Sequence, residues 1–452
     1  MTSKEQPDLT QEVTKLPGNP LSTAVVLLAG GAGLMVVALA LAWGNEGGLA
    51  RFMHVYLVNY AFFLSISLGA VFFVAVQHVT HAGWSVSVRR LMEILAANST
   101  LMAVLFLPIL ATVLMGNGVL YVWADPNAFA ADTEQVAHDD SEKHALGDAE
   151  DHKDEHASHD AHTEAAHREL LQHKSPYLNG PFFTVRFVVY FVVWIGLARF
   201  FLKRSREQDE TGDHQLTNSM ERISPIAIVL YGVTVSFASF DMLMSLDPFW
   251  FSTIYGLYYF SGAVVGFFAT MILVAMTLQA TGRLTNAITV EHYHELGKLL
   301  FAFVVFWGYI AFSQYMLIWY ANIPEETVWF KARQSTQTWV ILSLVLLCGH
   351  LLIPFFGLIS RGAKRSKAVL AFWAIWLLIA HWIDMYYLVM PKFYIDMAHH
   401  NVTPPPFGAV DVISFVALGA AYFGGLVLVA GNGSLLANRD PRLNESLAFE
   451  NA

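Results

Sequence analysis

The sequence predicts an all-α integral membrane protein with ten transmembrane helices, and three observations carry that prediction. Hydrophobic residues make up 55% of the 452 residues and charged residues only 14%, against about a quarter in a soluble domain. The apolar residues gather in runs of roughly 20, the length that a helix needs to cross a bilayer. No long run alternates apolar and polar residues, so a β-barrel is not expected.

Ten apolar runs are predicted to cross the membrane. Their approximate bounds are 22–43, 54–79, 92–122, 182–203, 224–246, 252–279, 298–322, 337–359, 368–390 and 410–430. We expect helices two to five and six to nine to form two tandem four-helix bundles, with helices one and ten at the periphery. The predicted division is a tail (1–21), helices one to three (22–123), a loop (124–181), helices four and five (182–251), the second bundle (252–391), a loop with helix ten (392–431) and a tail (432–452).

Lys and Arg in the short connections lie mostly on one side of this topology, and such residues favour the cytoplasm. That side holds Arg89, Arg90, Lys203, Arg204, Arg206, Arg283, Arg361, Lys364, Arg365 and Lys367, together with both tails. The other side has only Arg51, Lys331, Arg333 and Lys392. Both termini are therefore predicted to be cytoplasmic. The first twenty residues are polar and lack the pattern of a signal peptide, so the first apolar segment is expected to be retained.

The loop after helix three is predicted to lie outside the cell and is unusual in composition. Residues 131–175 contain thirteen Asp or Glu, four Lys or Arg and eight His, so nearly all of the net charge of −10 belongs to this insert. A segment so acidic and so poor in aromatic residues is expected to be a solvated, mostly disordered loop. A weak metal-gathering role for its histidines is the alternative.

A short motif occurs twice, at the end of helix five and at the end of helix nine. The two stretches are "DMLMSLDPFW" (241–250) and "DMYYLVMPKF" (384–393), each with Asp-Met, five residues and then Pro. Glu93 and Glu295 also occupy matching positions at the cytoplasmic starts of helices three and seven. This agreement predicts an internal duplication in which each proline ends its helix near the outer face.

Aspartates inside a span are costly, so Asp241 and Asp384 are the leading site candidates. Asp241 could reach Arg186 on the preceding helix, and His381 shares a helical face with Asp384. The remaining candidates are polar residues at the outer face, at mid-membrane and at the inner face: His54, Gln314, His350, Glu93 and Glu295. This layering is typical of proton half-channels or quinone-head pockets. The alternative is that the aspartates are helix-end acids that reach the headgroup region and that the inner groups are solvated.

Redox cofactors of most kinds are not expected in this chain. Its one cysteine, Cys348, leaves no c-type haem motif and no set of thiolates for an iron–sulfur cluster. His350 and His381, predicted at similar depth on neighbouring helices, leave a b-type haem as an alternative, although Asp384 competes for His381. No metal ligands are predicted.

One stretch resembles a known family. Residues 293–330, "YHELGKLLFAFVVFWGYIAFSQYMLIWYANIPEETVWF", resemble the F subunit of alternative complex III, a quinol:cytochrome c oxidoreductase subunit of the polysulfide-reductase membrane-anchor (NrfD-like) family. The resemblance extends over nearly the whole membrane portion, and that family also has ten helices in two four-helix bundles. The acidic insert is not part of the family pattern.

The resemblance implies a place in a bacterial inner-membrane respiratory complex. Its implied partners are a second NrfD-like membrane subunit, an iron–sulfur subunit, and multihaem and monohaem cytochromes c, which would carry the iron–sulfur clusters and haem c. It implies a quinol, with menaquinol expected, as reductant and possible ligand. This chain would add quinone contact, a proton path, or both. An ion-coupled or proton-coupled secondary transporter and a purely structural anchor are the alternatives.

Overall fold

The chain folds as an all-helical membrane protein, as predicted. The computed structural model describes residues 12–44, 47–126, 166–399 and 407–451, and those residues contain no β-strand. Within them, ten segments are long and apolar enough to cross a membrane. Most of the acidic insert, residues 127–165, lies outside the described residues, so the predictions for it remain predictions.

The first half of the chain provides five spans. Their helices are α1 (Pro20–Trp43), α2 (Gly48–Val79), the consecutive α3 (Val86–Ala97), α4 (Ser99–Leu105) and α5 (Leu107–Leu114), then α8 (Gly180–Thr211) and α9 (Gln215–Met242). Short 3₁₀ turns follow at η1 (Val122–Ala124) and η3 (Met244–Leu246). The third span ends at Leu114 and not at 122 as predicted, because the apolar residues beyond it form a turn and η1 instead.

The second half provides the other five spans. They are α10 (Tyr255–Ala280), α11 (Val290–Ala321), the group α13 (Gln337–Leu346), η4 (Leu347–Leu352) and α14 (Ile353–Leu358), then α16 (Lys367–His399) and α17 (Ala409–Ala430). Short helices α12 (Pro324–Ala332), α15 (Arg361–Arg365) and α18 (Leu443–Leu447) lie between or after them. The segment η4 is a π-helical turn inside its span.

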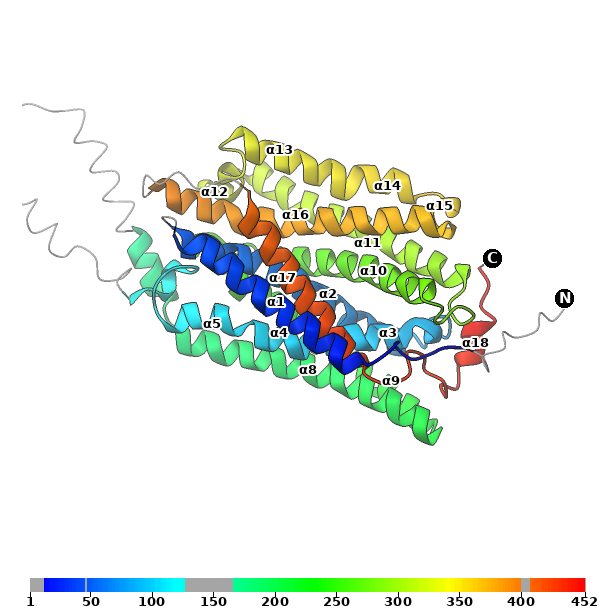
Figure 1. Ribbon diagram of the computed structural model, residues 1–452. Coiled ribbons are helices and arrows are strands. Elements are labelled where there is room, and N and C mark those ends of the chain that lie inside the picture. The colour runs from blue at the N-terminus through cyan, green and yellow to red at the C-terminus, as the bar shows by residue number, and fades with distance from the viewer. Residues whose placement is uncertain (1–11, 45–46, 127–165, 400–406, 452) are drawn as a thin grey trace, which may run out of the picture.

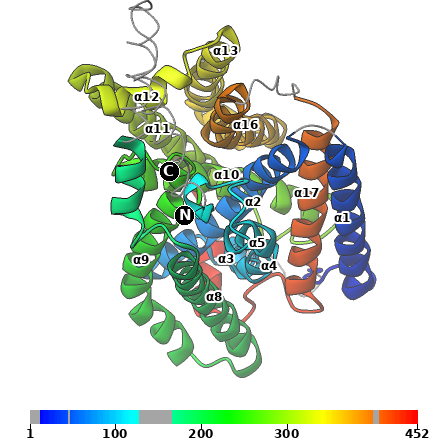
Figure 2. The ribbon, with the colours of Figure 1, turned by 90° about the vertical axis from the view of Figure 1, so that its left-hand side faces the viewer.

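Two four-helix bundles form the body of the protein, as predicted. One contains α2, α3–α5, α8 and α9, and the other contains α10, α11, α13–α14 and α16. The bundles meet where α2 packs against α10 and α16. Outside them, α1 and α17 pack on each other along their lengths (Figures 1 and 2).

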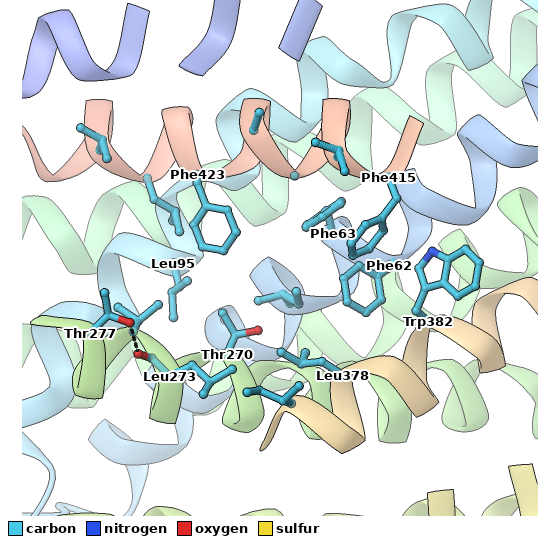
Figure 3. A pocket seen from close by; sticks show the side chains of 18 of the residues that line it. Phe62, Phe63, Leu95, Thr270, Leu273, Thr277, Leu378, Trp382, Phe415 and Phe423 are labelled. Carbon is cyan, nitrogen blue, oxygen red and sulfur yellow. Dashed lines mark hydrogen bonds between the residues drawn. The ribbon is translucent and has the colours of Figure 1, made fainter. Parts of the chain in front are cut away.

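A groove separates α17 from the bundles. It encloses a cavity of about 820 Å³, lined by residues of α2, α3, α10, α16 and α17 and almost wholly apolar (Figure 3). Phe62, Phe63 and Phe415 lie together on one part of its wall (Figure 3).

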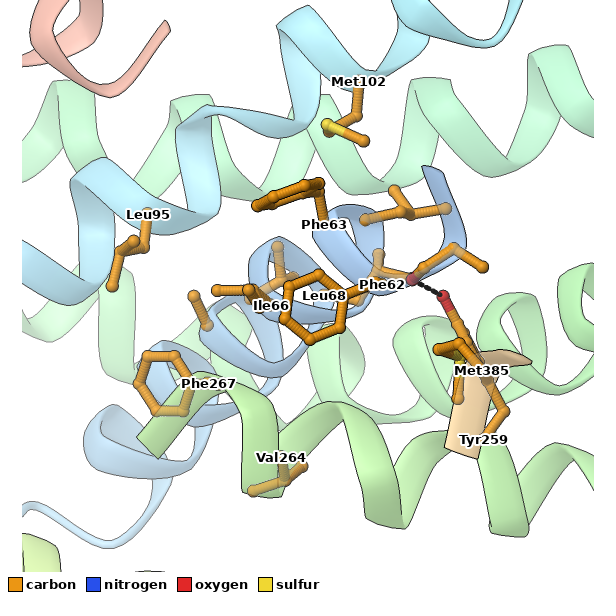
Figure 4. Close-up of a cluster of buried hydrophobic side chains, with 14 of the residues drawn as sticks. Phe62, Phe63, Ile66, Leu68, Leu95, Met102, Tyr259, Val264, Phe267 and Met385 are labelled. Carbon is orange, nitrogen blue, oxygen red and sulfur yellow. Dashed lines mark hydrogen bonds between the residues drawn. The ribbon is translucent and has the colours of Figure 1, made fainter. Parts of the chain in front are cut away.

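The centre of the protein is the helix α2, which is buried on all sides. Its Phe62, Phe63 and Ile66 lie within a cluster that also takes side chains from α3, α4 and α10 (Figure 4). The hydroxyl of Tyr259 on α10 donates to the carbonyl of Ala61 at 2.9 Å, which ties the two bundles together at this level (Figure 4). Because α2 contacts protein on every side, a polar group on it is costly unless another part of the protein provides a hydrogen-bond partner.

Both described ends of the chain lie at the same end of the bundles (Figure 1), which we call the termini end. There Glu12 accepts hydrogen bonds from the backbone N–H groups of Thr285 and Asn286, in the connection between α10 and α11. The side chain of Asn451 donates to Glu291 at 3.2 Å. The described residues contain ten spans, an even number, so both ends of the chain must lie on the same side of the membrane. Which side of the membrane the termini end faces stays a prediction.

Candidate functional site

Asp384 lies near the middle of α16 with a fully buried side chain. The hydroxyl of Tyr258 donates to one carboxylate oxygen, and Trp307 Nε1 donates to the other at 3.1 Å. Among the residues that the structure describes, no Lys or Arg forms an ion pair with it. A buried carboxyl with neutral donors and no cation is costly to ionise, which is unusual in a purely structural role.

His381 lies one turn before Asp384 on the same face of α16, yet the two side chains bond to different partners. The Ser65 hydroxyl donates to the Phe62 carbonyl at 2.6 Å, so its oxygen accepts from His381 Nε2 at 2.8 Å. This assignment places the ring proton on Nε2 and leaves a lone pair on Nδ1. Nδ1 has no hydrogen-bond partner among the described residues. The direct Asp384–His381 pair considered from the sequence is therefore replaced by two separate sets of bonds.

Two glycines of α10 make room for these side chains. A Cβ atom at Gly266 would lie 2.8 Å from His381 Cδ2, and one at Gly262 would lie 3.0 Å from His381 Cε1. The Phe62 ring packs on His381 with centroids 5.4 Å apart. His381 is thus enclosed by close packing and by its bond to Ser65.

His350 completes the group, and it lies on the π-helical turn η4. Its ring lies 3.8 Å from that of Trp307 and 6.2 Å from that of His381, between centroids. Neither of its ring nitrogens has a hydrogen-bond partner in the described part of the chain. Single π-helical turns inside α-helices occur frequently at functional sites. Asp384, His381, His350, Tyr258, Trp307 and Ser65 are called the Asp384 cluster below.

Asp241 has a different environment, because a cation neutralises it. Arg186 donates to both carboxylate oxygens, from Nε at 2.8 Å and from Nη2 at 3.0 Å. Tyr190 donates to the same carboxylate at 2.8 Å. Arg186 also donates to the Tyr177 carbonyl and stacks on the Tyr177 ring. This bidentate pair fixes the ends of α8 and α9 relative to each other and has the character of a structural clamp.

The two prolines of the repeated motif also differ. The helix α9 ends at Met242, before Pro248, whereas α16 continues through Pro391 to His399. The prediction that Pro391 ends its helix is therefore wrong. Pro391 has no N–H, so the Tyr387 carbonyl four residues earlier loses its helical donor. Asp384 consequently lies near the centre of its helix and not close to its end.

Arg333 supplies the missing donor, and it is a residue that sequence reasoning did not place in the site. Its Nε donates to Tyr387 O at 3.1 Å and its Nη2 to Leu388 O at 3.0 Å. The guanidinium is buried and lies 3.4 Å from the centre of the Trp329 ring. Burial lowers the pKa of Arg333 to about 10, which still leaves it charged near neutral pH. The sequence signal that could have identified Arg333 is an Arg shortly before one span together with a proline inside a later span.

His54 and Gln314 are buried but lie apart from the Asp384 cluster. His54 bonds through Nδ1 to the Ala50 carbonyl at 2.8 Å and is roughly 16 Å along α2 from Ser65. Gln314 is about 10 Å along α11 from Trp307. His54 Nε2 and Gln314 Nε2 have no hydrogen-bond partner among the described residues. Both residues lie toward the end opposite the termini.

Glu93 and Glu295 do not play equivalent parts at the termini end. Glu93 is fully buried, and Arg90 donates to it at 3.1 Å. Arg90 also pairs with Asp209 at 2.7 Å, while Arg89 pairs with Asp440 of the C-terminal segment. Glu295, in contrast, forms a 2.5 Å surface pair with Lys298. Glu93 therefore belongs to a network that joins α3, α8 and the C-terminal segment.

The Asp384 cluster brings together several groups that can each take up or release a proton. The cluster combines a carboxyl group, two imidazoles with unpartnered nitrogens and two hydroxyls within one buried region. No group of three or more potential metal ligands occurs among the described residues. Comparison of the chain with protein-family models and with curated proteins found no match.

Proposed function

We propose that this chain is an integral membrane subunit of a respiratory quinol:cytochrome c oxidoreductase of the alternative complex III type, in a bacterial inner membrane. In this proposal the chain carries protons through the second bundle and also contacts the quinol. The resemblance of residues 293–330 to the F subunit of that complex supports the class. The Asp384 cluster supports the role, and Trp307 of the cluster lies within the resembling stretch.

The observation that carries the proposal is the carboxyl group of Asp384, buried at mid-helix with two neutral donors and no cation among the described residues. A carboxyl held in this way can take up a proton without breaking an ion pair. His381 Nδ1 and whichever ring nitrogen of neutral His350 carries the lone pair can accept a proton. A relay needs groups that gain and lose protons near neutral pH, and carboxyl and imidazole groups are the usual choices.

The electron chemistry belongs to partners in this proposal. A second NrfD-like subunit, an iron–sulfur subunit and multihaem and monohaem cytochromes c would bind the redox centres. Quinol, with menaquinol expected, would be the reductant. This chain would contribute no redox metal, and its effect on turnover would act through protons or quinol position.

The first test asks whether the chain belongs to such a complex. A tag on the chain should recover c-type cytochromes and iron–sulfur protein from solubilised membranes. The competing class is a secondary transporter, in which helices are often interrupted at the substrate site. The π-helical turn at His350 is the observation that favours that class. Recovery of the chain alone, in an intact folded state, would overturn the respiratory assignment.

The second test asks whether Asp384 acts in proton transfer. Asp384→Asn keeps the shape and one of the two acceptor oxygens, which can still accept from Trp307 Nε1, and its N–H can donate to the Tyr258 hydroxyl. The replacement removes the titratable proton. We expect quinol oxidation or the associated proton release to fall at least about tenfold while the complex still assembles. Tyr258→Phe should give a smaller loss, and Tyr259→Phe on the next position of α10 is the matched control with no expected effect. Unchanged turnover and proton stoichiometry in assembled Asp384→Asn would make the chain a structural anchor.

A further inference from the structure

The cavity beside α17 is elongated and almost wholly apolar. Its lining runs from Asp411, near one end of α17, to Ala430 at the other. Those residues are separated by about 30 Å of helix, close to the hydrocarbon thickness of a bilayer. The cavity of about 820 Å³ therefore extends along most of the length of α17.

The groove opens sideways, toward the position of the membrane lipids. Large apolar side chains on its rim are exposed, among them Ile375 and Ile379 of α16 and Val412, Val416 and Phe423 of α17. A molecule could therefore enter from the bilayer without unfolding the protein. Gly419 and Ala420 of α17 also line the cavity.

Asp411 lines the cavity at the end opposite the termini, and one of its carboxylate oxygens has no hydrogen-bond partner among the described residues. Asp411 is 1% exposed and lines the cavity. Its Oδ2 accepts from Arg51 at 2.6 Å and from the Gly408 N–H at 2.9 Å, whereas Oδ1 has no hydrogen-bond partner in the described part of the chain. An unpaired buried carboxylate oxygen is costly, and a donor on a ligand would relieve that cost.

We propose that this groove binds a long-chain amphipathic membrane molecule. Its apolar chain lies along α17, and its head group donates an O–H or N–H hydrogen bond to Asp411 Oδ1. Two kinds of molecule share this chemistry: an isoprenoid quinol, with a phenolic O–H, and a phospholipid with an ammonium or hydroxyl head. The inference rests on the groove and not on the proposed function. The Phe62 ring forms part of the wall and also packs on His381, so an occupant would lie one side chain away from the Asp384 cluster.

A cavity-filling variant tests the groove. The full chain, purified in mild detergent, should retain about one amphipathic molecule per chain by native mass spectrometry. Ala420→Trp places an indole in the groove and should lower that retention at least tenfold. Ala32→Trp adds the same side chain on the exposed face of α1 and should leave retention unchanged. Thermal unfolding establishes that both variants fold, and equal retention in all three proteins would overturn the proposal.

Adding back defined molecules tests the head group and identifies the source. Delipidated protein would be offered phosphatidylethanolamine or phosphatidylcholine, which differ in whether the ammonium carries N–H donors. It would also be offered menaquinol or menaquinone, which differ in the phenolic O–H. We expect the donor-bearing member of at least one pair to bind roughly tenfold more tightly, the scale of a hydrogen bond to a charged group. Preference within the first pair identifies a structural lipid, and preference within the second identifies a quinol. Absence of preference in both pairs, or of any binding, overturns the role of Asp411.

Discussion

Arg333 donates from Nε to the carbonyl oxygen of Tyr387 at 3.1 Å, in the turn of α16 where Pro391 provides no N–H. The guanidinium thus replaces a missing backbone donor inside a buried region. It allows α16 to continue beyond the proline and so places Asp384 near the helix centre. In the first bundle α9 ends before Pro248 and needs no such donor. The same motif therefore has two structural outcomes.

The link between Arg333 and Pro391 predicts a coupled pair of mutations. Arg333→Ala leaves the Tyr387 and Leu388 carbonyls without the guanidinium, and we expect it to cost about 1–3 kcal/mol of stability. Pro391→Ala restores an N–H for Tyr387 O, so the double variant should recover part of that loss. Denaturant or thermal unfolding of all four proteins gives the coupling energy, expected to be at least about 0.5 kcal/mol. Strictly additive effects would contradict this account of the proline.

Asp241 and Asp384 should respond differently to the same amide replacement. Asp241→Asn leaves Arg186 as a buried cation without a counter-charge, at a cost of about 3–5 kcal/mol, so folded yield should fall. Asp384→Asn removes no ion pair and should leave folded yield near wild type. Fluorescence-detected size exclusion of the two variants measures this contrast. Restoration of yield by a paired Arg186→Met, Asp241→Leu replacement would assign the loss to the unpaired charge, and equal yields of the two single variants would contradict the clamp role of Asp241.

Gly266 is predicted to be intolerant of even one methyl group. In Gly266→Ala the new Cβ would lie 2.8 Å from His381 Cδ2, so the ring must move and its bond to Ser65 must lengthen or break. We expect a loss of about 1–3 kcal/mol in stability. Gly33→Ala on the open face of α1, where a Cβ meets nothing within 4 Å, is the control and should be neutral or slightly stabilising. Thermal unfolding compares the two, and a neutral Gly266→Ala would show that the His381 packing is loose.

The orientation of the chain is open to a direct labelling test. In a Cys348→Ser background, a cysteine at position 141 of the acidic insert should react with a membrane-impermeant maleimide in intact cells. A cysteine at position 3 should react only after the membrane is opened. The reason is the Lys and Arg bias toward the connections of the termini end. The reverse pattern of labelling would show that the predicted orientation is wrong. The termini end, and the side of the Asp384 cluster nearer to it, would then face the outside.

Removal of residues 135–170 should leave folding and assembly intact. The segment is too acidic and too poor in aromatic residues to form a core of its own. Gel filtration of the deleted protein and activity of its complex measure the result. Loss of a basic cytochrome partner on deletion would instead identify the insert as an electrostatic docking segment.

The sequence predicted the fold well because hydrophobic run length is a local signal. Its errors lie where polar residues are buried by partners that are distant in the chain. The sequence predicts a connection at Arg89 and Arg90, yet both lie inside α3. There Glu93, Asp440 and Asp209 neutralise them. No residue near position 90 indicates that Arg89 and Arg90 have ion-pair partners more than a hundred residues away in the sequence.

The site was predictable only in its charged members. The sequence identifies Asp384, His381 and His350 as candidates because titratable residues are rare inside spans. Tyr258, Trp307 and Ser65 did not, since aromatic residues and serine are ordinary in apolar helices. Their role arises because three different helices bring them to one carboxyl and one imidazole, a relation that exists only after the bundles have packed.

The pairing of α1 with α17 has a consequence for biogenesis. Among the described spans, α1 is made before the other nine and finds its main partner in α17, which is made after them. Until α17 has been made, α1 must remain in the lipid or beside the insertion machinery without that partner. A chain that stops before residue 409 therefore leaves α1 permanently without that partner, and it is the kind of unfinished product that membrane proteases and chaperones can distinguish from a finished one.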